Sequence, residues 1–248
     1  MITIYTIAYN EEVMLPFFIK WYRERFPDCK IVVYDNYSTD NTEKIALENK
    51  CEVIKYDTGN KLSDSKYLEI KNNCWKNAET DWVLVCDADE MLDVFEKDLK
   101  NIKETIIQGK GYNMYNIEEE ESLENMIYGS RAKQYDKYLL FNKKFITEIN
   151  YSPGCHTAFP KGSVAINNTF NLYHYSWLGV NYVFNKYQRN KQRLSEENIK
   201  NNWGFHYKDS FEKIQSYFDV AKNFYSKKEN IDGKNNIEFR HNFMSNGL

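Results

Sequence analysis

Apolar and amphipathic segments alternate through the first third of the chain. Four short runs are almost wholly apolar or β-branched, which is typical of strands buried on both faces of a sheet. These runs are residues 2–8, 31–34, 52–56 and 82–86. The intervening segments carry apolar residues at helical spacing or begin with helix-capping side chains, and they cover residues 13–25, 42–49 and 62–78. Strand and helix in this order predict an α/β fold with a parallel sheet and right-handed crossovers.

The pattern changes after Glu90. We predict a helix over residues 94–108, a strand over 111–117, and short aromatic strands between 135 and 175 that extend the sheet in antiparallel fashion. Two amphipathic helices of mixed charge follow, over residues 178–197 and 210–227, and a polar tail covers 229–248. We therefore expect one domain over residues 1–228, with parts at 1–92, 93–178 and 179–228.

Composition narrows the classes of partner. The chain has 248 residues, a net charge of −3 and no strongly basic block, which argues against a nucleic-acid partner. Five widely spaced cysteines without a C-x-x-C pair predict reduced thiols in a cytoplasmic protein, without a disulfide framework or a zinc site. The amino terminus lacks a basic leader, and no run approaches the roughly 18 apolar residues of a membrane span. We expect neither a signal peptide nor a membrane-spanning helix.

Candidate chemistry is concentrated where the fourth strand ends. The apolar run from Trp82 to Cys86 is followed at once by Asp87, Asp89 and Glu90. Hydrated carboxylates belong at the carboxyl edge of the sheet, where open α/β sheets bind ligands. Asp87 and Asp89 flank one small residue, so both can reach one hard cation. The alternative is a solvated acidic turn.

The other predicted parallel strands also end in polar residues, at 9–11, 35–36 and 57–58. Because these ends meet at one edge of the sheet, we predict a crevice of nucleotide size there. No G-x-G-x-x-G and no G-x-x-x-x-G-K-[ST] occurs, so the crevice is neither a dinucleotide site nor a P-loop.

Three motifs in this order resemble the glycosyltransferase family 2-like enzymes of the GT-A fold. They are the first strand and turn at residues 5–12, the loop Y-D-N-Y-S-T-D-N-T at 34–42, and the strand that ends in D-A-D-E at 82–90. Residues 135–137, 153–156 and 172–175 extend the resemblance to the subgroup with Y-D-N and D-A-D-E motifs. The chain departs from the commoner pattern at Asn36, where a second Asp is usual.

The resemblance implies a mixed, mostly parallel central sheet flanked by helices, with C-terminal helices. It also implies transfer of a sugar, with inversion, from a nucleotide sugar to a glycan or other hydroxyl acceptor. A UDP-sugar is the first donor to expect. Residues 1–92 would then form the nucleotide-binding half and 93–178 the acceptor half. Mn²⁺ or Mg²⁺ would neutralise the leaving diphosphate.

Roles follow for particular residues. We expect the donor nucleotide to contact Thr6, Ala8, Tyr9, Asn10, Glu11, Asp35, Asn36, Lys66, Asp87 and Ala88. We expect Asp87, Asp89 and His156 to bind the metal, and Asp136 to be the catalytic base. His156 could instead be a surface or packing histidine, and Asp136 could instead form a salt bridge. Lys66 and Lys71 could face the phosphates or could lie on the helix surface. We predict that His174 is a core histidine. The run Glu118 to Glu121 offers other candidates for the base.

Two rival functions remain at this stage. A nucleotidylyltransferase also uses acidic metal ligands on an α/β sheet, but a Gly-rich basic loop is expected after its first strand and is absent here. A sugar-nucleotide-binding protein without turnover is the second rival. Retention of Asn10, Asp87 and Asp89 argues against it.

Overall fold

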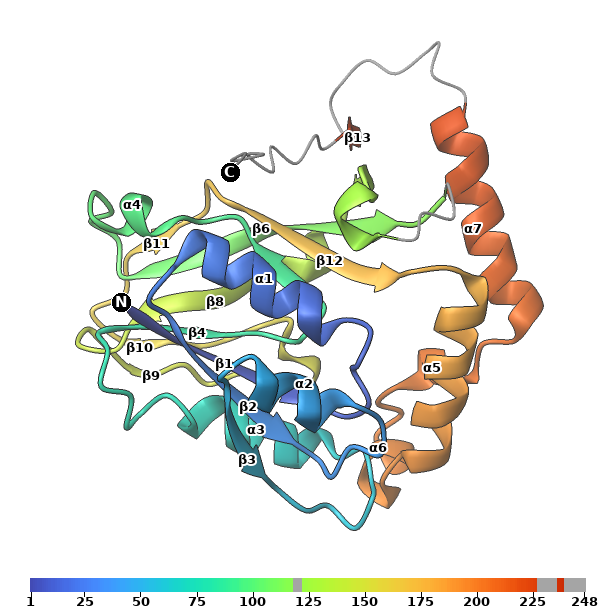
Figure 1. The fold of residues 1–248 in the computed structure, drawn as a ribbon, viewed down its shortest axis with the longest axis horizontal. Coiled ribbons are helices and arrows are strands. Elements are labelled where there is room, and N and C mark those ends of the chain that lie inside the picture. Colours follow the sequence, from blue (N-terminus) through green and yellow to red (C-terminus); the bar gives the residue numbers. More distant parts are fainter. Residues whose placement is uncertain (118–121, 227–235, 239–248) are drawn as a thin grey trace.

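The computed structural model describes residues 1–117, 122–226 and 236–238, and a large mixed sheet dominates it (Figure 1). The described part of the sheet has eleven strands, eight of them in the order β13-β7-β6-β8-β4-β1-β2-β3. A separate pair, β9 and β10, lies beside it. The predicted α/β class, a mixed central sheet flanked by helices, is confirmed.

Four parallel strands form one half of the sheet. This half contains β1 (Ile2–Ala8), α1 (Leu15–Arg25), β2 (Lys30–Asp35), α2 (Thr42–Glu48), β3 (Glu52–Lys55), α3 (Asp64–Asn73) and β4 (Trp82–Val85). All seven residues of β1 are buried, and Ile4 pairs with Ile31 on one side and Leu84 on the other. Three of the four runs of the sequence are therefore central strands. The run at residues 52–56 forms β3 instead, the edge strand, whose residues are exposed or partly buried, so the prediction of a strand buried on both faces is wrong there.

Helices cover both faces of this half. Ile4 and Leu84 belong to a cluster with the apolar face of α1, whereas Tyr5 and Val83 belong to a second cluster with Trp75, which follows α3. Successive side chains of a strand point to opposite faces, so α1 and α3 lie on opposite sides of the sheet.

The second half of the sheet is largely antiparallel. The chain from residue 90 to 177 contains β5 (Glu90–Leu92), α4 (Glu96–Leu99), β6 (Ile106–Tyr115), η1 (Leu123–Asn125), β7 (Tyr128–Arg131), η2 (Lys133–Tyr135), β8 (Lys137–Asn142), β9 (Ile146–Glu148), η3 (Pro153–Cys155), β10 (Lys161–Gly162), β11 (Ile166–Asn167) and β12 (Asn171–Trp177), of which β9 and β10 form the separate pair. β8 pairs antiparallel with both β4 and β6, which joins the two halves. The short strands expected between residues 135 and 175 are thus present.

The helix predicted over residues 94–108 is wrong. Only Glu96–Leu99 is helical, and β6 begins at Ile106, five residues before the predicted strand. Ile106 and Ile107 are fully buried and pair with Phe141 and Leu140 of β8. This tertiary pairing outweighs the helical spacing.

The C-terminal helices stand at the carboxyl edge of the parallel strands (Figure 1). They are α5 (Val180–Arg193), α6 (Glu196–Lys200), η4 (Phe205–Lys208) and α7 (Phe211–Ser226). The helix predicted over 178–197 stops at Arg193, because Leu194 is extended and bridges to Leu62. Ser195 then caps α6 by accepting a hydrogen bond from the Asn198 amide.

The acidic run Glu118 to Glu121 lies outside the described residues, as does the tail apart from β13 (Asn236–Glu238), which pairs with β7. Within the described part of the chain, no helix is both long and apolar enough to cross a membrane.

Candidate active site

A cavity of about 1080 Å³ opens where β1 and β4 end, and the C-terminal helices supply its opposite wall. Asp87 and Asp89 line it from the end of β4, together with Glu11, which follows β1. Trp177, Phe205 and Tyr217, contributed by β12, η4 and α7, line an aromatic arm of the cavity. The predicted crevice at the carboxyl edge therefore exists.

Buried hydrogen bonds to α1 and within the turn itself fix the turn that carries the acidic residues. The Tyr22 hydroxyl of α1 donates to the Glu90 carbonyl at 2.8 Å and accepts from the Leu92 amide at 3.0 Å. The Glu90 carboxylate accepts a hydrogen bond from the Asp87 amide at 2.9 Å. These buried contacts hold the two aspartates at the cavity floor.

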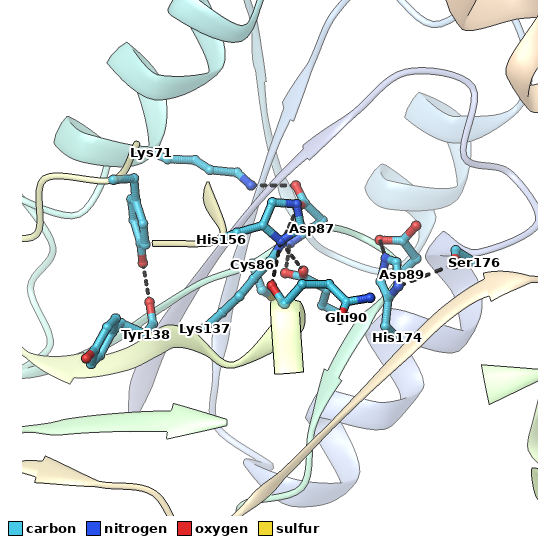
Figure 2. A network of polar contacts seen from close by, with 12 residues as sticks. Lys71, Cys86, Asp87, Asp89, Glu90, Lys137, Tyr138, His156, His174 and Ser176 are labelled. Carbon is cyan, nitrogen blue, oxygen red and sulfur yellow. Dashed lines mark hydrogen bonds and ion pairs between the residues drawn. The ribbon is translucent and has the colours of Figure 1, made fainter. Parts of the chain in front are cut away.

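Asp87 lies between two buried lysines (Figure 2). Its Oδ1 is 2.5 Å from Lys71 Nζ and its Oδ2 is 3.5 Å from Lys137 Nζ, and Lys137 also pairs with Glu90. Burial alone would raise the pKa of Asp87, but Lys71 and Lys137 outweigh it and hold that pKa well below the usual range. Asp87 is therefore ionised over the whole physiological range.

Asp89 faces a histidine (Figure 2). His174 Nδ1 lies 3.0 Å from Asn113 Oδ1, and His174 Nε2 lies 3.7 Å from Asp89 Oδ1. Because the amide oxygen of Asn113 can only accept, we assign the proton to Nδ1, which also lies 3.3 Å from Ser176 Oγ; in this tautomer the Nε2 lone pair faces the carboxylate. Burial lowers the pKa of His174 despite the negative charge of Asp89, which favours this neutral form.

A lone pair facing a carboxylate is a donor set that suits a cation. Lys186 Nζ, 3.4 Å from Asp89 Oδ2, is the nearest positive charge from α5. Among the described residues, no three His, Cys, Asp or Glu side chains lie together as a complete metal site. One carboxylate with substrate phosphates and water is a ligand set that Mg²⁺ accepts, and a transition ion such as Mn²⁺ can in addition take the imidazole nitrogen of His174. The orientation of His174 by Asn113 matches the way that protein metal sites orient their histidines.

The other predicted metal ligand, His156, lies at the cavity rim. Its Nδ1 is 2.8 Å from the Gln134 carbonyl, and its ring packs edge-on against Tyr135. Among the described residues no hydrogen bond or ion pair joins it to either aspartate. His174 is buried and hydrogen-bonded, as predicted for a core histidine, but it also approaches Asp89, which the sequence did not indicate.

The predicted nucleotide contacts divide into two groups. Tyr9, Glu11, Asp87 and Ala88 line the cavity. The remaining predicted residues, Thr6, Ala8, Asn10, Asp35, Asn36 and Lys66, are not among its lining residues. Asp35 is fully buried and pairs with Lys55, and Asn36 is hydrogen-bonded to Thr58 and Arg193.

The two lysines of α3 that could face the phosphates lie in different places. Lys66 pairs with Glu69 at 2.8 Å near the helix surface, whereas Lys71 is buried and lines the cavity. Five residues at about 100° each separate their side chains by roughly 140° around the helix, so only one can face the site.

The predicted base, Asp136, is engaged elsewhere. Its Oδ2 lies 2.6 Å from Arg131 Nη2, and its Oδ1 accepts a hydrogen bond from the Gly111 amide at 2.8 Å. Asp136 is not among the residues that line the cavity. The salt bridge left open by the sequence is present, with Arg131 as the partner, and the catalytic role stays a prediction.

Three cations of the cavity wall were missed by the sequence reasoning. Lys186, Arg189 and Arg193 all come from α5 and all line the cavity. Their spacing of three and four residues puts them on one face of a helix, and this was the available signal. It was interpreted only as mixed charge.

Comparison with known proteins gives the class that this fold and site define. Residues 3–163 match the sequence model described as glycosyl transferase family 2. The chain belongs to this family and is a glycosyltransferase. A nucleotidylyltransferase does not accord with this membership.

Solved structures of low identity are similar over different lengths. The S. aureus TarS 1–349 complex with UDP is 14% identical, with 97% of each chain covered and a TM-score of 0.46. Glucosyl-3-phosphoglycerate synthase from Mycobacterium tuberculosis, with Mn²⁺, UDP-glucose and phosphoglyceric acid, is 14% identical over 63% of this chain and 62% of that one, with a TM-score of 0.40. No curated protein sequence matches the chain significantly.

Proposed function

We propose that the protein transfers a sugar from a nucleoside-diphosphate sugar to a hydroxyl acceptor, with inversion at the anomeric carbon and with Mn²⁺ or Mg²⁺. The observation that carries the proposal is the proximity of two possible metal ligands, Asp89 Oδ1 and His174 Nε2, which lie 3.7 Å apart at the cavity floor. Family membership supports the reaction class, and the size of the cavity suits a nucleotide sugar.

In this proposal Asp89 and His174 hold the cation. The bond between the anomeric carbon and the diphosphate oxygen breaks with its electron pair on that oxygen, and the acceptor oxygen forms the new bond. A bound divalent cation supplies charge stabilisation for the departing diphosphate. Lys71 and Lys137 keep Asp87 ionised and fixed beside this position.

An inverting transfer also needs a base for the acceptor proton. We keep Asp136 as the proposed base, which requires its carboxylate to turn from Arg131 toward the cavity. The aromatic arm lined by Trp177 and Tyr217 is the proposed acceptor end, since aromatic faces pack against apolar faces of ligands.

Asp89→Asn tests the proposal. We expect the variant to fold normally and to lose transfer by at least about 2.7 kcal/mol of transition-state stabilisation, because a charge clamp is removed. Donor hydrolysis and sugar transfer are measured at a series of manganese concentrations, with UDP-sugars as the first donors tested. Lys191→Gln, on the exposed side of α5, is the matched control. Wild-type turnover by Asp89→Asn at ordinary manganese concentrations would refute the assignment.

A further inference from the structure

One face of α5 carries a basic stripe, defined here as Lys186, Arg189 and Arg193. The stripe lies over the carboxyl ends of the parallel strands, where its members contact Glu11, Asn10 and Asn36. α5 lies beyond residue 163, where the match to the family model ends. Nothing in that match therefore assigns a role to this face.

Arg193 is a buried cation that has no acidic partner within residues 1–117, 122–226 and 236–238. Only 5% of the residue is exposed, and its Nη2 donates to Asn36 Oδ1 at 3.0 Å while its Nε donates to Asn60 Oδ1 at 3.1 Å. Its guanidinium carbon lies 3.1 Å from the centroid of the Tyr9 ring. No carboxylate of the described residues forms an ion pair with it, although buried charges in proteins are ordinarily paired.

Arg189, one turn away, also has unused hydrogen-bonding capacity. Its Nη1 donates to the Asn10 carbonyl at 2.9 Å, and its Nη2 lies 3.8 Å from Glu11 Oε1. Its Nε is buried and has no hydrogen-bond partner among the described residues. Glu11 is meanwhile shared with Lys186, at 3.1 Å.

The stripe begins at the predicted metal position and leads away from it. Lys186 contacts Asp89, and Arg193 lies seven residues further, or about 10 Å along the helix. The guanidinium carbons of Arg189 and Arg193 lie 5.7 and 3.1 Å from the centroid of the Tyr9 ring. An anion that extends from Asp89 along α5 would meet both guanidinium groups in turn.

We infer that Arg189 and Arg193 bind the phosphate oxygens of the nucleoside diphosphate and so supply a second charge clamp on the side opposite Asp89. The inference rests on the proposed function and adds the residues that recognise the diphosphate. Planar guanidinium groups match phosphate geometry and form charge-assisted hydrogen bonds with it. The bound diphosphate would provide the counter-charge that Arg193 lacks.

Calorimetric titration of the wild type, Arg189→Gln, Arg193→Gln and Lys191→Gln tests the inference. The ligands are UDP, GDP and inorganic pyrophosphate, each with manganese. We expect either arginine substitution to raise the Kd for the wild type's preferred nucleotide by roughly tenfold or more, and the Kd for pyrophosphate similarly. Lys191→Gln, on the exposed side of the same helix, should bind as the wild type does.

The outcomes separate this inference from the proposed function. If the wild type binds none of the three ligands, the donor assignment fails, and the inference fails with it. If the wild type binds but both arginine variants match Lys191→Gln, only the inference is overturned. The inference is also overturned if the variants lose the nucleotide but keep pyrophosphate. Thermal melting checks folding, and the partly exposed Arg189 keeps the test decisive if Arg193→Gln fails to fold.

Discussion

At the scale of single residues, we expect substitutions of the two cavity histidines to differ in their effect on the manganese requirement. His174→Ala removes the lone pair that faces Asp89, so it should raise the manganese concentration needed for activity. His156→Ala removes a ring that bonds to the Gln134 carbonyl, so it should leave the manganese requirement unchanged. Titrating manganese against transfer for both variants compares them directly. A shift confined to His156→Ala would restore the ligand that the sequence predicted.

A second residue-scale prediction concerns Asp136. If it is the base, Asp136→Asn should lower kcat by about 10²–10⁴-fold with donor affinity unchanged. Loss of the ion pair with Arg131 and of the Gly111 contact should also lower the free energy of unfolding. Arg131→Gln removes the same ion pair without removing the carboxylate, so it is the control. Equal kcat values for the two variants would show that the role of Asp136 is structural.

At the scale of elements, β6 and η2 fit together only because residue 111 lacks a side chain. A Cβ at Gly111 would lie 2.5 Å from Tyr135 Cβ and 2.6 Å from the Tyr135 carbonyl. Tyr135 packs on His174 with ring centroids 4.0 Å apart, and Lys137 pairs with Glu90 behind Asp87. The fit of these two elements therefore positions the cavity floor.

Gly111→Ala should separate β6 from η2. We expect about 1–3 kcal/mol of destabilisation, as for other overpacked sites, together with weaker donor binding. Urea unfolding and nucleotide titration measure the two effects. Lys110→Ala, on the same strand, should change neither by a comparable amount. Unchanged stability of Gly111→Ala would mean that the two elements can move apart at little cost.

At the scale of the whole molecule, buried neutral histidines predict a loss of stability in mild acid. Burial lowers the pKa values of His174 and His206, so the unfolded chain, with histidine pKa near 6.5, binds protons before the folded protein does. The free energy of unfolding should therefore fall as the pH drops below about 6.5. Urea unfolding from about pH 7.5 to about pH 5 measures the fall. His174→Gln should show a smaller fall than the wild type, and an equal fall would refute the contribution of His174.

The sequence by itself determined the parallel half of the sheet and the acidic turn. Apolar runs bounded by polar loops leave few alternatives to central strands, and the acids after Cys86 must leave the core at a strand end. Local pattern failed for residues 94–108, because the pairing of Ile106 and Ile107 with β8 depends on a strand thirty residues away.

Tertiary structure alone decided which side chains meet. His174 follows Asp89 by 85 positions, and they meet only because β12 pairs with β5 and β6. The basic stripe of α5 lies beside Tyr9 and Asn36 because the chain that follows it is held by a bridge between Leu194 and Leu62. Spacing along one helix or strand can be read from local sequence, whereas distances between elements depend on packing of the whole chain.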